Sequence, residues 1–162
     1  MDYIDEIQWV GNRGLLALRK TAFLSSEQTP MSLFPYIQRW AMRMPVEECV
    51  ICGNESEIEQ TIFSVLFMRR VNLIMLTAAV PSEALIRRYR RAIDEGRLLI
   101  GWHCADTYTV ERRSALDRNE VMMCLADHIV VGYCTIGGAI DRARLKHPDM
   151  QFITYPNELF KD

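Results

Sequence analysis

The sequence lacks the features that define membrane proteins and the common nucleotide-binding enzymes. No apolar run reaches the roughly 18 residues that a transmembrane helix needs. The chain starts with the acidic segment Met-Asp-Tyr-Ile-Asp-Glu, which is unlike a signal peptide, so we expect a cytoplasmic protein without a membrane partner. It has no GxGxxG after its first predicted strand and no GxxxxGK followed by Ser or Thr. A typical dinucleotide or Walker-type site is therefore not predicted, and we expect no cofactor.

The five cysteines form neither a disulfide framework nor a complete metal site, because their number is odd and no second CxxC or histidine pair is present. Cys49 and Cys52 do have CxxC spacing. However, Val50 and Ile51 between them belong to an apolar run, which places the two thiols on opposite faces of a predicted strand. We expect reduced, mostly buried thiols and no bound metal.

The 162 residues fit one domain of ordinary size, predicted over residues 1–162 with 1–18 as a lead-in segment. Apolar residues make up 49% and charged residues 25%, so the chain can bury a core without cross-links. The formal net charge is -2, from 19 basic and 21 acidic residues, which gives no general attraction to nucleic acid. Basic residues still cluster at 87–91, predicted to face solvent, and at 112–118.

Short apolar runs alternate with longer amphipathic segments along the chain. The runs predict strands at 21–25, 48–52, 72–78, 97–102, 128–133 and 151–154. The segments between them predict helices at 31–43, 55–70, 81–95, 109–125 and 137–146. Such alternation implies right-handed βαβ crossovers. The sequence therefore predicts an α/β fold, with a three-layer, Rossmann-like, open and mainly parallel sheet of about six strands and helices on both faces.

Small and hydroxylated residues follow the predicted strands. In open parallel sheets, ligands bind at this carboxyl edge, where neighbouring strands send their connections to opposite faces. Unobstructed backbone N–H groups at a helix start favour an anion. Thr135, Gly137 and Gly138 are the best local candidates for holding a phosphate, although two glycines in a tight turn are the simpler interpretation. The other candidate ligands in these loops are Ser25, Ser26, Gly53, Asn54 and Ser56.

The strongest polar segment spans residues 111–119. Its Arg112, Arg113 and Arg118, together with Asn119, are predicted to face an anionic ligand across the sheet end. The alternative is a solvated helix face with local ion pairs. No nucleophile and base are recognisable from their spacing, so binding without catalysis is the favoured interpretation.

Four segments occur in an order that is typical of a known domain. Trp9-Val10-Gly11-Asn12 and two leucines precede the strand at 20–25, and Ile51-Cys52-Gly53 precedes Ile58-Glu59. Arg118-Asn119 and then Leu125-Ala126-Asp127 precede the strand at 128–131, which is followed by the turn at 135–140. This series resembles the v-G-n, S-G-x-A-x-G-I-D, R-N-R and S-G-s-l-x-T segments in the Rossmann-like domain of the DNA-processing protein A (DprA/Smf) family.

The resemblance implies binding of single-stranded DNA, loading of a recombinase and self-association. Three basic positions of the family differ in this chain. Its arginine after the first strand falls at Glu27, its arginine in the second loop falls near Ser56, and the second arginine of R-N-R falls at Glu120. Each lost phosphate contact is expected to weaken binding to DNA and to lower its salt dependence.

A related architecture occurs in the LOG phosphoribohydrolases of the lysine-decarboxylase-like family. These enzymes have an arginine-led helix before a strand that ends in P-G-G-x-G-T-x-x-E. Arg112-Arg113 and Gly137-Gly138 are similar in placement, but Ala139-Ile140-Asp141 replaces the rest of that motif.

Three hypotheses follow from the sequence. The favoured one is a DprA-like domain that binds single-stranded DNA or a nucleotide without catalysis. The others are a hydrolase of nucleoside monophosphates and a scaffold or sensor domain with a degenerate site. A homodimer is compatible with the aromatic residues of the chain.

Overall fold

A computed structural model describes residues 7–103 and 112–154, and the side chains of 7–103 and 118–154. The strands are β1 (Gln8–Gly11), β2 (Lys20–Leu24), β3 (Cys49–Cys52), β4 (Asn72–Thr77), β5 (Leu98–Trp102), β6 (His128–Val131) and β7 (Gln151–Phe152). The α-helices are α1 (Phe34–Met42), α2 (Glu57–Met68), α3 (Glu83–Arg88), α4 (Arg90–Asp94), α5 (Arg112–Leu125) and α6 (Ala139–Arg142). Short 3-10 helices are η2 (Arg13–Ala17), η3 (Met31–Leu33) and η4 (Ala143–Leu145).

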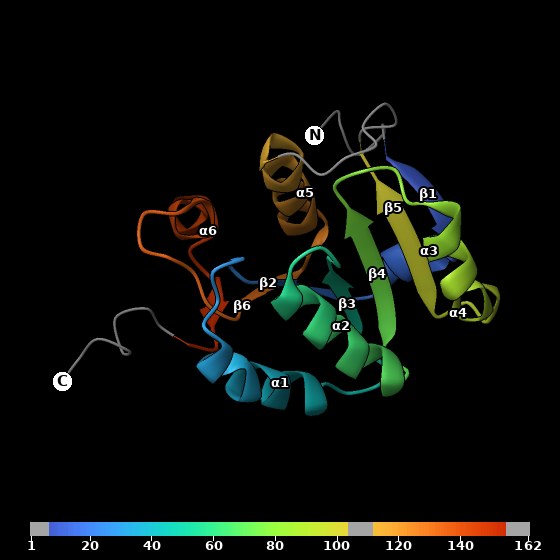
Figure 1. Ribbon diagram of the computed structural model, residues 1–162, viewed down its shortest axis with the longest axis horizontal. Coiled ribbons are helices and arrows are strands. Elements are labelled where there is room, and N and C mark those ends of the chain that lie inside the picture. The colour runs from blue at the N-terminus through green and yellow to red at the C-terminus, as the bar shows by residue number, and fades with distance from the viewer. Residues whose placement is uncertain (1–6, 104–111, 155–162) are drawn as a thin grey trace.

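The strands form one sheet in the order β1-β5-β4-β3-β2-β6-β7 (Figure 1). Every neighbouring pair is parallel except β1 and β5, which are antiparallel. The predicted α/β fold with a mainly parallel sheet is therefore confirmed. The segment predicted only as a lead-in supplies an additional strand, β1, on the edge of the sheet.

Helices cover both faces of the sheet, and strands β1 to β5 contribute side chains to both cores. In β3, for example, Val50 and Cys52 belong to the core under α1, α2 and α4. Cys49 and Ile51 belong to the core under η2, α5 and α6. All four residues are fully buried, as expected for a strand inside a parallel sheet. The predicted placement of the two cysteines on opposite faces is confirmed.

Burial also sets the chemistry of these thiols. It raises the pKa of Cys49 to about 12 and raises the pKa of Cys52 well above its ordinary value. Both cysteines are free thiols. They are consequently inert packing groups rather than thiolate nucleophiles.

The predicted helix at 81–95 is divided into α3 and α4 at Tyr89. The Tyr89 ring is buried, and its edge meets Phe63 and Phe67 of α2 at centroid distances of 5.5 and 5.2 Å. The four arginines around it are exposed, as predicted for the basic run at 87–91. Sequence periodicity did not reveal the break, because it arises from packing against a distant helix.

The strand order reverses between β2 and β6. The chain moves from β2 through β3 and β4 to β5, and then returns through α5 to pair β6 with the other side of β2. The loops that leave the carboxyl ends of β2 and β6 run to helices on opposite faces. This is the position at which open α/β sheets usually bind ligands. Among the described residues, no helix is long and apolar enough to cross a membrane.

Gly11→Ala tests the docking of β1 on the sheet. Gly11 has a φ of +119°, and an added Cβ would collide with the carbonyl oxygen of Leu98. We expect a loss of about 3 kcal/mol in the free energy of unfolding, measured by chemical denaturation. Gly137→Ala is the control, because Gly137 has a φ of +77° but open space around its Cα, so it should lose only about 1 kcal/mol. Equal losses would contradict the assigned steric role of Gly11.

Candidate functional site

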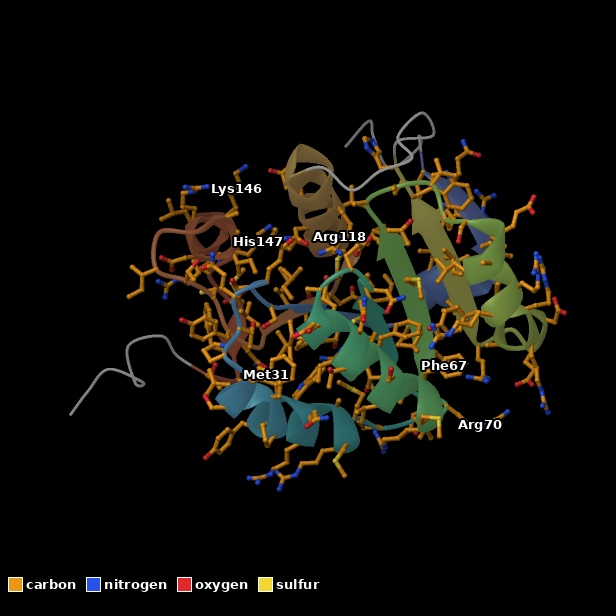
Figure 2. All side chains as sticks on the ribbon, in the orientation of Figure 1. Met31, Phe67, Arg70, Arg118, Lys146 and His147 are labelled. Atoms are coloured by element: carbon orange, nitrogen blue, oxygen red, sulfur yellow. The ribbon has the colours of Figure 1, made fainter. Side chains whose placement is uncertain are left out.

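A buried arginine lies between two glutamates at the carboxyl end of β3. Arg118 is 8% exposed and Glu59 is 3% exposed. The guanidinium Nη2 lies 2.9 Å from Glu59 Oε2, and Nη1 forms an ion pair with Glu55. Figure 2 places Arg118 between α5 and the start of α2. We refer to Glu55, Glu59 and Arg118 as the buried triad.

Local sequence explains how the triad is positioned. Ser56 caps α2, with its hydroxyl accepting from the Glu59 N–H, while the Glu59 side chain accepts from the Ser56 N–H. This capping box holds the Glu59 carboxylate above the sheet end. Gly53 completes the arrangement, because a Cβ there would overlap with both Glu59 and Arg118. A side chain at position 53 would therefore displace Glu59 and Arg118 from their present positions.

Glu55 connects the triad to the neighbouring loops. Its Oε1 accepts from the Ala78 N–H at 2.9 Å, and its Oε2 accepts from the Asn54 N–H at 3.2 Å. Burial works against the charged guanidinium, but the Glu59 and Glu55 carboxylates outweigh it and raise the pKa of Arg118. With two carboxylates around one guanidinium, the triad has a formal charge of -1 and adds no positive potential to the sheet end.

At the carboxyl ends of β2 and β6, polar groups of the two following loops form hydrogen bonds with each other. Ser25 Oγ lies 2.7 Å from Thr29 Oγ1 and accepts from the Tyr133 N–H at 3.1 Å. The Ser26 N–H donates to the Tyr133 carbonyl at 2.8 Å. These contacts tie the loop after β2 to the loop after β6.

The predicted phosphate turn also has internal partners. The Gly137 N–H donates to Asp141 Oδ2 at 2.7 Å, and the Gly138 N–H donates to the Thr135 carbonyl at 3.0 Å. Asp141 additionally pairs with Arg144. The hydrogen bond from Gly137 and the contact with Arg144 lower the pKa of Asp141. The Asp141 carboxylate thus takes the position at the Gly137 amide that was predicted for a phosphate.

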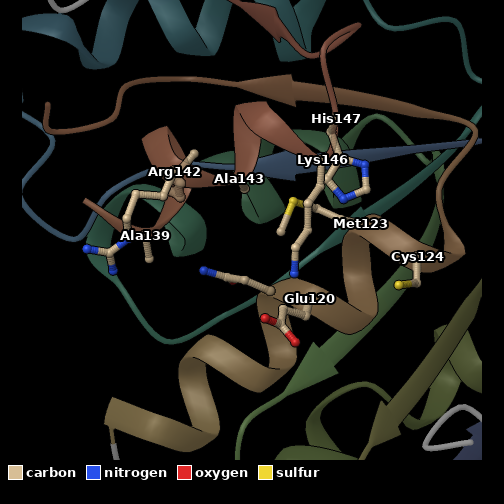
Figure 3. A pocket seen from close by; sticks show the side chains of 10 residues that line it. Glu120, Met123, Cys124, Ala139, Arg142, Ala143, Lys146 and His147 are labelled. Atoms are coloured by element: carbon tan, nitrogen blue, oxygen red, sulfur yellow. The ribbon is translucent and has the colours of Figure 1, made fainter. Parts of the chain in front are cut away.

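A cavity of about 350 Å³ lies beside these groups, between α5 and the α6–η4 segment (Figure 3). We call it the α5–α6 cavity. Its polar lining consists of Asn119, Glu120, Cys124, Arg142, Lys146 and His147, and its apolar lining of Met123, Ala139, Ile140 and Ala143. In Figure 3 the side chains of Lys146 and Glu120 point toward the same space.

The predicted site residues do not all meet in one place, and Asn119 alone among them is part of the cavity lining. Asn119 lines the α5–α6 cavity while its Oδ1 accepts from Arg118 Nη2 at 2.8 Å. Neither Arg118 nor Gly137 is among the residues that line this cavity. The side chains of Arg112 and Arg113 lie outside the described residues.

Sequence comparison matches this chain to no family model and to no curated protein. Comparison of folds does find relatives. A structure of DNA processing protein A from Helicobacter pylori superimposes with a TM-score of 0.69 at 15% identity, over 90% of this chain and 70% of that one. The chain has the fold of DNA processing protein A (DprA). The resemblance predicted from the sequence is confirmed at the level of the fold.

A second DprA structure, from Streptococcus pneumoniae, superimposes with a TM-score of 0.64 at 12% identity. The match covers 94% of this chain and 64% of that chain, so this chain spans about two thirds of the length of the DprA structures that it matches. The structure from Helicobacter pylori is described as showing a single-stranded DNA binding mode.

The DprA-like fold shows where the three altered family positions lie. Glu27 is exposed in the loop after β2, Ser56 is the cap of α2, and Glu120 lines the α5–α6 cavity. The sequence interpretation missed Arg142, Lys146 and His147, although three basic residues and a histidine between 142 and 147 were a visible signal. It also missed Glu59 as the partner of Arg118, for which the Ser-x-x-Glu capping pattern at 56–59 was the available signal.

Arg118→Met tests the buried triad. The substitution leaves two carboxylates facing each other without a cation, so the free energy of unfolding should fall by about 3–5 kcal/mol at pH 7. Denaturant titration at pH 7 measures this loss. The triple substitution with Glu55→Gln and Glu59→Gln should recover part of the loss, and a single-variant loss below about 1 kcal/mol would refute the role of the triad.

Asp141→Asn tests the carboxylate at the turn. Because the pKa of Asp141 is lowered in the folded state, its stabilising effect is complete above the ordinary value of 3.8 and is lost as the pH falls through the lower folded value. The difference in thermal midpoint between the native protein and Asp141→Asn should be constant near neutral pH and shrink below pH 3.8. A difference that grows with acidification would contradict this assignment.

Proposed function

We propose that this chain is a non-catalytic binding domain for single-stranded DNA and that the α5–α6 cavity holds part of the sugar-phosphate backbone. Two observations support this proposal. The chain has the fold of DprA, and one solved DprA structure is described as showing a single-stranded DNA binding mode. The chain also has a basic cavity beside its sheet end. Phosphate contacts supply most of the affinity in binding of this kind.

The charge distribution of the cavity supports this proposal. Arg142 donates to the carbonyl oxygen of Gly137 at 3.1 Å and has no carboxylate partner within the described residues. Lys146 is exposed and likewise has no carboxylate partner in that part of the chain. Glu120 is the one acidic residue in the lining, so the lining has a formal charge of +1 with His147 counted as neutral.

The other predicted ligands are less available for an external phosphate. The Nη1 and Nη2 groups of Arg118 pair with two glutamates, although its buried Nε has no hydrogen-bond partner among the described residues. The Gly137 amide donates to Asp141. Their predicted role as direct phosphate ligands stays a prediction. In the proposed arrangement Arg118 acts indirectly, because it fixes Asn119, whose side chain lines the cavity.

Absence of catalysis is the second part of the proposal. Cys124 and His147 both line the cavity, but no hydrogen bond joins them in the described structure. Incubation with a panel of nucleoside 5′-monophosphates tests this part, since release of free base would show a phosphoribohydrolase activity of the LOG kind instead.

Substitutions in the cavity test the binding proposal. Lys146→Gln and Arg142→Gln should each weaken binding to a labelled oligothymidylate by about 3- to 10-fold, and each should reduce the slope of log affinity against log salt by about 0.7. Glu120→Gln should strengthen binding, because it removes the carboxylate from the lining. Fluorescence anisotropy over a range of salt concentrations measures these changes.

A distant substitution provides the control. Arg87→Gln removes an exposed positive charge on α3, so it should leave the affinity for the oligonucleotide nearly unchanged. If the native protein shows no binding even at low salt, the proposal fails. The pairing of Arg118 with two glutamates and of the Gly137 amide with Asp141 would then favour the alternative of a scaffold domain with a degenerate site.

A further inference from the structure

A second groove lies over α1, and its lining combines two arginines with two aromatic rings. We call it the α1 groove. It has a volume of about 370 Å³ and is lined by Tyr36, Arg39, Trp40, Arg43, Met44, Pro45 and Ile153. It is separate from the α5–α6 cavity, because α1 packs on one face of the sheet and α5 and α6 pack on the other. Neither the sequence analysis nor the proposed function accounts for it.

Helical spacing places the polar and aromatic residues of the groove on one side of α1. Tyr36, Arg39 or Trp40, and Arg43 follow one another at intervals of three or four residues. Ile37 and Ala41 occupy the opposite side of the helix and are fully buried. The exposed surface of α1 is therefore supported by a rigid core contact.

The two aromatic rings differ in their surroundings: Trp40 packs on the core, and Tyr36 is exposed beside an arginine. The Trp40 ring stacks on Phe23 of β2 with a centroid distance of 5.3 Å and an interplanar angle of 23°. Tyr36 is 56% exposed, and the Arg39 guanidinium lies 5.8 Å from the centroid of its ring. An exposed aromatic ring beside a guanidinium is the arrangement on which unpaired nucleobases stack.

The charge of the groove has a single sign. Its lining contains no acidic residue, and the sequence from 28 to 46 contains none either. Arg39 and Arg43 are exposed and form no ion pair within the described residues. The α1 groove is thus complementary to an anionic chain that carries flat apolar groups.

The sheet edge brings the α1 groove near the α5–α6 side of the molecule. Phe152 of β7 packs with the core under α5 and α6, and Arg144 of η4 lies over its ring at 5.4 Å. Ile153, the next residue, packs with the opposite core and lines the α1 groove. Successive residues of an extended chain point to opposite faces, so Phe152 faces the α5–α6 side and Ile153 faces the α1 side. The end of β7 therefore lies between the two basic surfaces.

We infer that the α1 groove binds unstacked bases of the same single-stranded nucleic acid whose backbone is held in the α5–α6 cavity. This inference rests on the proposed function and extends it to a second contact surface. An acidic peptide would satisfy the arginines but would leave the exposed face of Tyr36 without a stacking partner. A single strand supplies both the phosphate charges and the flat bases.

Oligonucleotides with and without bases separate this contact from simple charge attraction. The native protein should bind an oligothymidylate at least about fivefold more tightly than an abasic strand of equal length, because base stacking adds to the phosphate contacts. Tyr36→Ala should abolish this preference while leaving affinity for the abasic strand unchanged. Tyr36→Phe retains the ring and should keep the preference.

Charge variants complete the design. Arg39→Gln with Arg43→Gln should weaken binding of both strands, whereas Arg87→Gln with Arg90→Gln removes the same charge from exposed positions on α3 and α4 and should weaken neither. Lys146→Gln should weaken both strands equally and keep the preference for bases. Thermal midpoints of all variants confirm that each is folded before its affinity is interpreted.

Several results would overturn the inference. One is an unchanged preference for bases in Tyr36→Ala, and another is equal competition by poly-glutamate and by oligothymidylate, which would indicate an acidic-peptide groove. A native dimer that Tyr36→Ala converts to a monomer, with DNA affinity unaltered, would assign the groove to self-association. If Lys146→Gln has no effect while Tyr36→Ala does, the α5–α6 cavity assignment fails and the α1 groove stands; the reverse result rejects the groove alone.

Discussion

The contact of Arg118 with Glu55 and Glu59 is the constraint on which the carboxyl edge of the sheet depends. It joins α5 to the cap of α2, and through Glu55 it reaches the loop after β4. A buried guanidinium requires such partners, because removing a charge from water is costly unless opposite charges and hydrogen bonds replace the lost hydration. The glycine at 53 is part of the same solution, since only a residue without a side chain leaves room for the pair.

This internal pairing decides where positive charge remains available. The sheet end, where an open α/β fold usually binds its ligand, is neutralised by Glu55, Glu59 and Asp141. Within the described part of the chain, basic side chains without a carboxylate partner line the α5–α6 cavity and the α1 groove, which lie over opposite faces of the sheet. In this protein the DprA fold therefore carries available positive charge on these two surfaces.

The two surfaces differ in chemical character, and the difference follows from the local sequence. The lining of the α5–α6 cavity combines Arg142 and Lys146 with one carboxylate and contains no Phe, Tyr or Trp. The α1 groove combines two arginines with Trp40, which is fixed by stacking on Phe23, and with the exposed ring of Tyr36. Charge alone attracts any polyanion, whereas fixed rings select for partners with planar groups.

Periodicity in the sequence predicted the fold class and most of the strands, but neither the edge strand β1 nor the strand order. Continuous apolar runs such as 72–78 identify strands buried on both faces, and their alternation with helices leads to a parallel sheet. The same reasoning placed Cys49 and Cys52 on opposite faces. What it could not determine was which side chains meet across the sheet end, because Arg118 and Glu59 are 59 residues apart and their pairing depends on strand order. Only the tertiary structure showed that the arginine is matched by internal carboxylates, since the free energy of a buried charge is set by neighbours that are distant in the chain.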